Sequence, residues 1–296
     1  MGNNKPLVSI ALCTFNGEKY IAEQLVSILN QDYSNLEIVI IDDKSNDNTV
    51  NILKSFSDKN QNIKLVLNET NIGFNNNFRK ALDLCSAEYI AIADQDDVWV
   101  ENKITRLMEN IGDNLLIYHD SAYINNLGEP TNKSTLSHHR FVKGNCAKNL
   151  LYYNCVSGHT CLIKKELLTL TAGFPTHFYY DWWLAYTAAC RSKITFIIDK
   201  LVLHRKHEES STGKDKTDAK TTRIAHLKLF YNHQETPNNL KNFIQLLLDG
   251  YKELDRNHFS SKLFKTLLLN FNSLFYVRKR SLFSICNLIL RESKSK

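Results

Sequence analysis

Long hydrophobic runs are missing from this sequence of 296 residues. A helix needs about 20 consecutive, mainly apolar residues to cross a bilayer, and no such run occurs. The short apolar run at residues 7–13 has no cleavage-site signature after it, so we expect the first strand of a fold rather than a signal peptide. A membrane-spanning anchor is therefore not expected in this sequence.

The chain also lacks the cysteine spacing of a metal centre or a disulfide framework. Its seven cysteines are odd in number and scattered, and no two of them form a Cys-x-x-Cys pair. This pattern argues against a disulfide scaffold and a zinc site, and it favours a reducing compartment. We therefore expect a cytoplasmic protein.

Acidic residues are scarce near the C-terminus. The formal net charge is +6, and residues 258–296 hold eight Lys or Arg against one acid, Glu292, so the rest of the chain is close to neutral. Nucleic acid is a poor partner for such a chain, because the basic excess is terminal and no binding motif accompanies it. An anionic membrane surface fits the charge better.

Two acidic clusters stand directly after short apolar runs. Asp94-Gln95-Asp96-Asp97 follows residues 89–93, and Asp42-Asp43 follows residues 36–41. Such runs are typical of buried strands, and open α/β sheets bind ligands at the carboxyl edge of their strands. Three acids in four residues repel one another, and a cation or a phosphate–metal complex would neutralise them. The alternative is a polar turn, with Asp97 capping a helix that begins near Trp99.

Short strands alternate with amphipathic helices in the first half of the chain, which predicts βαβ units and a parallel sheet. Helices replace this alternation from about residue 214. We therefore expect a catalytic domain at residues 1–213 and a basic amphipathic helical tail at residues 214–296. The polar stretch at residues 125–145 is expected to be a loop over the site.

The chain resembles the family 2 glycosyltransferases of the GT-A fold. The matching segments are residues 8–16, 41–47, 71–73 and 94–97. Together, in this order and spacing, they indicate the family more specifically than any one of them does alone. The later segments 180–185 and 203–207 resemble the rhamnosyltransferase-like branch of that family. The resemblance covers about residues 7–213. It implies an α/β fold of GT-A type, with a Rossmann-like, mostly parallel sheet flanked by helices and followed by a helical C-terminal tail.

The resemblance implies a metal site in the Asp-x-Asp motif. Asp96 is the expected ligand of Mn²⁺ or Mg²⁺, with Asp94 contacting the ribose or the water shell of the metal. A hard cation with oxygen ligands bridges the two phosphates of the donor and acts as a Lewis acid on the leaving group.

The resemblance also implies a nucleotide pocket. Asp43 matches the position that accepts from the N3–H of uracil or thymine, and Cys13, Thr14 and Phe15 lie in the loop that wraps the base and ribose. Cys13 stands where a hydroxyl residue is often found, which weakens a specific hydrogen bond there. Phe15 could stack on the base or belong to the core. Arg79 could reach a phosphate or be an exposed helical arginine.

Two later segments approach the same pocket in the resemblance. Gly158 lies in a segment that comes close to donor and acceptor, since glycine permits a close backbone approach, and His159 could contact the sugar. Arg205 and His207 resemble a late Tyr-Arg-x-His loop, although His204 replaces the tyrosine. His207 could close on the diphosphate or metal, or be a surface histidine.

Asp181 matches the catalytic base of the family. Tyrosines and tryptophans flank it on both sides, and desolvation in such a setting raises the basicity of a carboxylate toward the range useful for proton abstraction. The alternative role is the N-cap of a helix over residues 182–190.

These residues predict an inverting, metal-dependent glycosyltransferase. It would move a sugar, with rhamnose as one candidate, from a UDP- or dTDP-sugar to a hydroxyl of a growing cell-surface glycan or a lipid-linked saccharide. Two rival functions are a nucleotidyltransferase, which would need a Gly-rich phosphate loop where only Gly17 stands, and a non-catalytic membrane-associated adaptor. The adaptor is disfavoured because the sequence keeps the three aspartates that catalysis would need, Asp43, Asp96 and Asp181.

The apolar residues of the tail are interleaved with basic ones. Such a segment can lie on an anionic membrane surface with its apolar side down, which would place the enzyme peripherally on the inner face of the cell membrane. The same residues could instead pack on the catalytic domain or on a second subunit of a homodimer. The motifs determine neither the sugar, nor the acceptor, nor the linkage.

Overall fold

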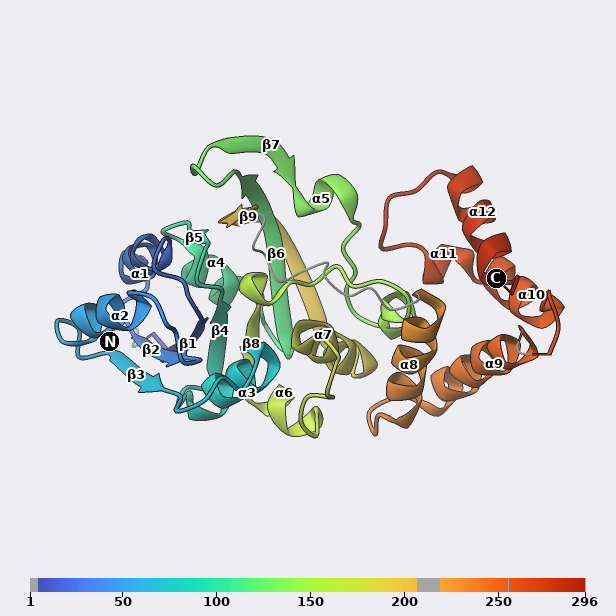
Figure 1. Cartoon of the computed structure of the whole chain (residues 1–296), viewed down its shortest axis with the longest axis horizontal. Helices are drawn as coiled ribbons and strands as arrows, with labels where there is room; N and C mark the ends of the chain where they lie inside the picture. The colour runs from blue at the N-terminus through green and yellow to red at the C-terminus, as the bar shows by residue number, and fades with distance from the viewer. Residues whose placement is uncertain (1–4, 207–218, 255, 296) are drawn as a thin grey trace.

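The computed structural model of the protein describes residues 5–206, 219–254 and 256–295 (Figure 1). One half of its central sheet is parallel, as predicted, and the four strands lie in the order β3-β2-β1-β4. Their bounds are β1 (Val8–Thr14), β2 (Leu36–Asp42), β3 (Ile63–Leu67) and β4 (Tyr89–Ala93). The ends of β1, β2 and β4 form the carboxyl edge on which the acidic clusters stand.

The other half of the sheet is mixed. From β4 the order continues β8-β6-β9-β5, and β7 pairs with the C-terminal part of β6. The pairs β4–β8, β8–β6 and β9–β5 are antiparallel, whereas β6 and β9 run parallel. The bounds are β5 (Val98–Trp99), β6 (Leu116–Ile124), β7 (Pro130–Ser134), β8 (Leu162–Lys164) and β9 (Ile194–Arg205). Strand β9 runs back to the acidic motif, because Val98 and Trp99 pair with its C-terminal part.

Helices cover both faces of the sheet, and alternation along β1 shows why. Ile10 and Leu12 lie in one hydrophobic cluster with residues of α1, α2 and α4, whereas Ala11 lies in the other with residues of α3, α6 and α7. Successive side chains of a strand point to opposite faces, so a strand covered on both faces is apolar throughout. These helices are α1 (Ile21–Leu29), α2 (Thr49–Ser57), α3 (Phe74–Leu84), α4 (Lys103–Asn110), α6 (Glu166–Leu170) and α7 (Tyr180–Cys190).

Two local expectations were wrong. Asp97 does not cap a helix near Trp99, because β5 follows it and α4 begins at Lys103. The stretch at residues 125–145 is not a plain loop: it contains β7 and α5 (Thr135–His138). Its end is tied to the C-terminal region, since the Arg140 N–H donates to the Val277 carbonyl at 2.7 Å. The 3₁₀ turns η1 (Ala147–Leu150) and η2 (Gly158–Thr160) follow.

The C-terminal helices pack on the sheet domain and share its core (Figure 1). Phe230 of α8 lies 4.0 Å from the Tyr186 ring of α7, and Phe275 lies 5.5 Å from the Tyr152 ring, measured between ring centroids. These helices are α8 (Ala219–Asn232), α9 (Asn238–Leu254), α10 (Ser261–Leu269), α11 (Phe271–Leu274) and α12 (Leu282–Glu292). None of the described helices combines the length and apolar character needed to span a membrane. The expected boundary at residue 213 falls outside the described residues, so the division into two domains stays a prediction.

Candidate active site

Asp43 stands at the end of β2 and holds the loop that leads into α3. Its carboxylate accepts hydrogen bonds from the Asn68 side chain at 2.8 Å and from the N–H groups of Ile72 and Gly73 at 2.8 and 2.9 Å. Gly73 has φ 80°, a conformation that glycine adopts without a Cβ penalty. Asp43 is buried, and its predicted contact to a pyrimidine stays a prediction.

The predicted base-binding loop divides into buried and exposed parts. The Thr14 hydroxyl donates to Asp42 at 2.8 Å, and the Cys13 thiol lies in the hydrophobic core, where burial raises its pKa. Phe15 is 43% exposed, which excludes a core role for its ring. Gln95 clamps the Phe15 backbone, accepting from its N–H at 2.8 Å and donating to its carbonyl at 3.1 Å. Sequence reasoning missed Gln95, although it stands between the two aspartates of the motif.

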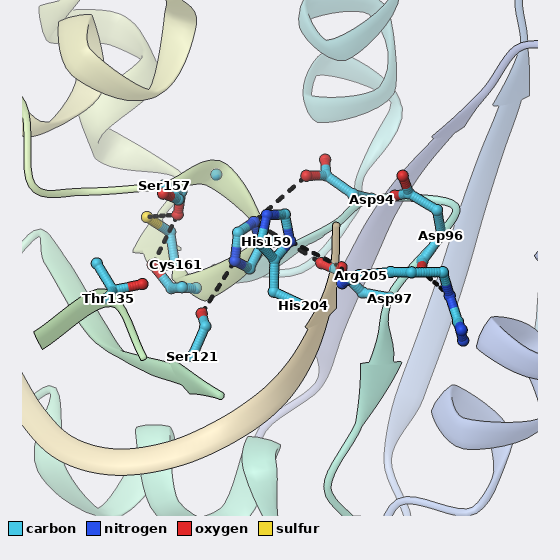
Figure 2. A network of polar contacts seen from close by, with 12 residues as sticks. Asp94, Asp96, Asp97, Ser121, Thr135, Ser157, His159, Cys161, His204 and Arg205 are labelled. Atoms are coloured by element: carbon cyan, nitrogen blue, oxygen red, sulfur yellow. Dashed lines mark hydrogen bonds and ion pairs between the residues drawn. The ribbon is translucent and has the colours of Figure 1, made fainter. Parts of the chain in front are cut away.

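The acidic motif meets two stacked histidines (Figure 2). The rings of His159 and His204 are 4.4 Å apart between centroids and 7° from parallel. Asp97 Oδ1 lies 2.9 Å from His204 Nδ1, and Asp97 Oδ2 lies 3.7 Å from His159 Nδ1. Asp94 Oδ2 is 3.3 Å from the same His159 nitrogen. The motif, η2 and β9 therefore converge at one point.

This cluster has the composition of a metal site. Ligand atoms of Asp97, His159 and His204 lie within 4.8 Å of one another, and within the described part of the chain Asp97 Oδ2 is buried without a hydrogen-bond partner. Carboxylate oxygen suits the Mn²⁺ or Mg²⁺ expected here, whereas imidazole nitrogen suits other transition metals better, so the aspartates are the residues that fit this cation. Asp96 is not a member of this group, and its carbonyl accepts from Arg205 Nε at 3.1 Å. The prediction that Asp96 binds metal stays a prediction.

Burial shifts the titration of this cluster. It lowers the pKa of His159 to about 3 and raises the pKa of Asp94. Burial also lowers the pKa of Lys103 to about 7; this side chain lies over the Trp99 ring and donates to the His159 carbonyl at 2.6 Å. Burial lowers the pKa of His204, but the Asp97 carboxylate raises it, and the net shift is upward. The neutral His159 imidazole is the form that can bind a metal.

Asp181 lies in the first turn of α7, and it is not the N-cap, which is Tyr179. One carboxylate oxygen accepts from the Trp182 N–H at 2.6 Å and the other from the Gly158 N–H at 3.2 Å. Burial raises the pKa of Asp181 to about 7, and the Asp94 charge acts in the same direction against the two N–H donors. Gly158 is required by its neighbour, because a Cβ there would lie 1.9 Å from the Tyr180 hydroxyl oxygen.

Asp181 and the two histidines line one cavity of about 1240 Å³. Other lining groups come from the start of α3, from residues 151–157 and 174–179, and from α8. The cavity is at least as large as a small-molecule site, which spans about 300–1,000 Å³. Of the predicted site residues, Asp181 lines it, whereas Asp43, Asp94 and Asp96 do not.

The two predicted arginines contact protein groups. Arg79 pairs with Asp83 at 2.8 Å on α3. Arg205 is buried, and its guanidinium bonds Glu23 at 2.6 Å. His207 lies outside the described residues. Roles for these three residues in donor binding stay predictions.

A family model described as glycosyl transferase family 2 matches residues 9–169 of the chain. This range spans more than half of the 296 residues and contains the acidic motif, Gly158 and His159. The chain belongs to glycosyltransferase family 2. The predicted family and GT-A fold are thereby confirmed.

Curated relatives carry glycosyltransferase names. An uncharacterized glycosyltransferase of Haemophilus influenzae is 29% identical over 71% of this chain and 72% of its own length. The dTDP-rhamnosyl transferase RfbG of Shigella flexneri is 31% identical over 68% of this chain and 73% of its own. The Escherichia coli enzyme WfgD, named UDP-Glc:alpha-D-GlcNAc-diphosphoundecaprenol beta-1,3-glucosyltransferase, is 29% identical over 60% of this chain and 68% of its own.

Solved structures share the fold. Staphylococcus aureus TarS, residues 1–349, in complex with UDP-GlcNAc, has a TM-score of 0.63 at 22% identity, covering 82% of this chain and 72% of that one. The mannosyltransferase PcManGT of Pyrobaculum calidifontis, in complex with GDP-Man and Mn²⁺, has a TM-score of 0.55 at 18% identity, covering 97% of this chain and 79% of that one.

Proposed function

We propose that the protein is an inverting glycosyltransferase in which Asp181 is the catalytic base. The observation that carries the proposal is the state of this carboxylate: it lines the cavity, two backbone N–H groups fix its orientation, and burial raises its pKa to about 7. A general base works best when its pKa lies near the working pH.

The chemistry of the base determines the stereochemistry. Asp181 takes the proton from the acceptor hydroxyl as the oxygen attacks the anomeric carbon and the nucleotide diphosphate leaves. One base serving one displacement inverts the anomeric configuration. The N–H groups of Gly158 and Trp182 hold the carboxylate in one orientation, which lowers the entropic cost of reaching the reactive geometry.

The leaving diphosphate needs charge neutralisation. A bound Mn²⁺ or Mg²⁺ would supply Lewis-acid stabilisation of the departing phosphates. The residues proposed to hold it are Asp94 and Asp96 of the motif, together with Asp97, His159 and His204, whose ligand atoms already converge. The complex of the structural neighbour PcManGT with GDP-Man and Mn²⁺ supports a cation at such a site.

The donor is proposed to be a UDP- or dTDP-sugar, with rhamnose as one candidate. RfbG is named as a dTDP-rhamnosyl transferase and WfgD as a glucosyltransferase that uses UDP-Glc. TarS is solved in complex with UDP-GlcNAc. Asp43, Thr14 and the exposed Phe15 are proposed to form the nucleotide side of the site, at the ends of β1 and β2.

The acceptor is proposed to be a hydroxyl of a cell-surface glycan or a lipid-linked saccharide, and the WfgD name supports the second. Access to such an acceptor would be helped by peripheral binding of the C-terminal helices to the cytoplasmic face of the membrane. Leu269, Leu282 and Phe283 are 83%, 68% and 77% exposed, and exposed Lys279 and Arg291 lie in the same region. A homodimer contact is the alternative use of this surface.

The two rival functions are weaker. Membership of a glycosyltransferase family supports sugar transfer over nucleotidyl transfer. An adaptor with a dead site would have no use for an aspartate of raised pKa on a cavity wall, and perturbed carboxyls of this kind cluster at functional sites.

A ligand panel tests the proposal directly. The protein is heated with UDP-, dTDP- and GDP-sugars, with and without Mn²⁺, and a true donor should raise the melting temperature by linkage. The preferred donor is then incubated with candidate acceptors, and the anomeric configuration of the product is read by NMR. Retained configuration would refute the single-displacement mechanism, and no stabilisation by any nucleotide sugar would refute the function.

A further inference from the structure

One face of α8 lines the cavity on the side away from the acidic motif. Ala219, Thr222, Arg223 and His226 all line it, and their spacing of three and four residues places them on one helix face. The His226 ring packs edge-on against Trp182, 5.3 Å away between centroids. Because Trp182 follows Asp181 in the chain, this face continues the wall on which the proposed base lies.

Arg223 has unused hydrogen-bonding capacity in this wall. Its side chain is 12% exposed, and its guanidinium lies 4.3 Å from the centroid of the Tyr152 ring. Nε and Nη1 are both buried and have no hydrogen-bond partner among the described residues, although Nε is 3.6 Å from the Glu292 carboxylate. Buried N–H groups of a charged side chain are costly when unsatisfied. The protein groups around Arg223 therefore compensate its charge only in part.

Further positive charge gathers beside Arg223. The guanidinium groups of Arg278 and Arg280 lie 5.1 and 5.8 Å from the centroid of the Tyr153 ring, and Arg278 lines the cavity. Within the described residues, the carboxylate that pairs with one of these three arginines is Glu292, which lies beside Arg223. Glu292 also accepts a hydrogen bond from the Tyr251 hydroxyl at 2.7 Å. Three guanidinium groups against one carboxylate leave this end of the cavity cationic.

We propose that Arg223 and Arg278 form an anion subsite for a phosphate group of the acceptor. The planar guanidinium of arginine forms charge-assisted hydrogen bonds with phosphate oxygens, and Arg223 and Arg278 both line the cavity. The phosphate could belong to a lipid diphosphate or to a phosphate ester within a glycan, and the same chemistry recognises both. The inference rests on the proposed transfer reaction, because it places the acceptor beside Asp181.

The test measures binding by calorimetry in EDTA, so that no metal draws a diphosphate to the donor site. The probes are geranyl diphosphate for the lipid source, glycerol 3-phosphate for the glycan source, and geraniol as the uncharged control. The variants are Arg223→Gln, Arg223→Lys and Arg278→Gln. Arg256→Gln is the matched control, because Arg256 is exposed and lies outside the cavity lining.

We expect Arg223→Gln to lower the affinity for at least one phosphate probe about 10-fold or more, as for the loss of a charge-assisted hydrogen bond. Arg278→Gln should lower this affinity less. Geraniol binding and the Arg256→Gln variant should be unchanged, and the tighter probe identifies the source. Arg278 is exposed, so its variant reports on the subsite even if Arg223→Gln fails to fold.

Three outcomes would overturn the proposed subsite. The phosphate probes could bind no more tightly than geraniol, both arginine variants could leave phosphate binding unchanged, or excess UDP could displace the probe. Failure of every nucleotide sugar to stabilise the protein would refute the proposed function instead, and the two failures are measured separately.

Discussion

Replacing Asp181 by asparagine should abolish sugar transfer and stabilise the protein at the same time. The pKa of this carboxyl is raised from 3.8 to about 7, and each unit is worth about 1.36 kcal/mol between the two protonation states. Burying the charged form therefore costs about 4 kcal/mol, and less where the side chain is partly wetted. The asparagine side chain avoids this cost but turns one acceptor oxygen into a donor, which offsets about 1 kcal/mol. Because Asp181 is only partly buried, this cost is discounted by about a further 1 kcal/mol, and the net gain expected above pH 8 is about 2 kcal/mol.

The pH dependence of the gain is its signature. A carboxyl whose folded pKa is raised contributes its stability below the unfolded value of 3.8, and that contribution is lost as the pH rises through about 7. The variant should therefore melt close to the native protein near pH 4 and about 5 °C higher near pH 8, since 1 kcal/mol is about 2–4 °C for a domain of this size.

The assay is thermal unfolding between pH 4 and pH 9 without ligands, with Asp113→Asn as the control because Asp113 is exposed. Transfer by the native protein should fall below about pH 7, as the base becomes protonated. Donor affinity of the variant should be largely intact, because the base acts on the acceptor. A melting difference independent of pH, or a variant that still transfers sugar, would refute the reasoning.

Three further changes test other parts of the structure. Gly158→Ala should destabilise the fold by about 1–3 kcal/mol in urea unfolding and lower activity, because the new Cβ meets the Tyr180 hydroxyl; unchanged unfolding would contradict the close approach. Asp97→Asn and Asp96→Asn should each reduce the Mn²⁺-dependent part of the donor-induced melting shift, and a variant that keeps the full shift identifies a residue that is not a ligand. Changing Leu282 and Phe283 together to Ser should reduce pelleting with anionic liposomes at low salt without lowering the melting temperature, since both side chains are exposed; unchanged pelleting would refute the membrane role.

The sheet edge could be predicted from sequence because its signal is local. Strands β1, β2 and β4 are apolar runs followed by polar residues, and position alone places Asp43 and Asp94 together. The second half of the sheet has no such signal. Strands β5 and β8 have two and three residues, too few to show a period.

The histidine cluster could not be predicted for a different reason. Asp97, His159 and His204 come from three distant parts of the chain and share no motif spacing, so only the folded sheet brings their ligand atoms within 4.8 Å. The sequence did carry one sign of it: His204 stands where the family has a tyrosine. Stacked on His159 at 4.4 Å, His204 gives this chain a nitrogen donor that a tyrosine would not provide.

The C-terminal helices contribute to the cavity wall as well as to the exposed surface of the protein. A truncation near residue 257 would remove Leu263, Leu267 and Phe275, which are buried in the shared core, so its effect on membrane binding could not be separated from unfolding. The core of these helices also positions Arg223, because Phe230 anchors α8 on α7 two turns further along. The face of α8 that meets the cavity and the exposed apolar side chains of α12 therefore belong to one packed unit. If α12 lies on a membrane, Arg223 and Arg278 are held at a fixed position relative to that membrane, which would suit an acceptor whose phosphate is linked to a lipid.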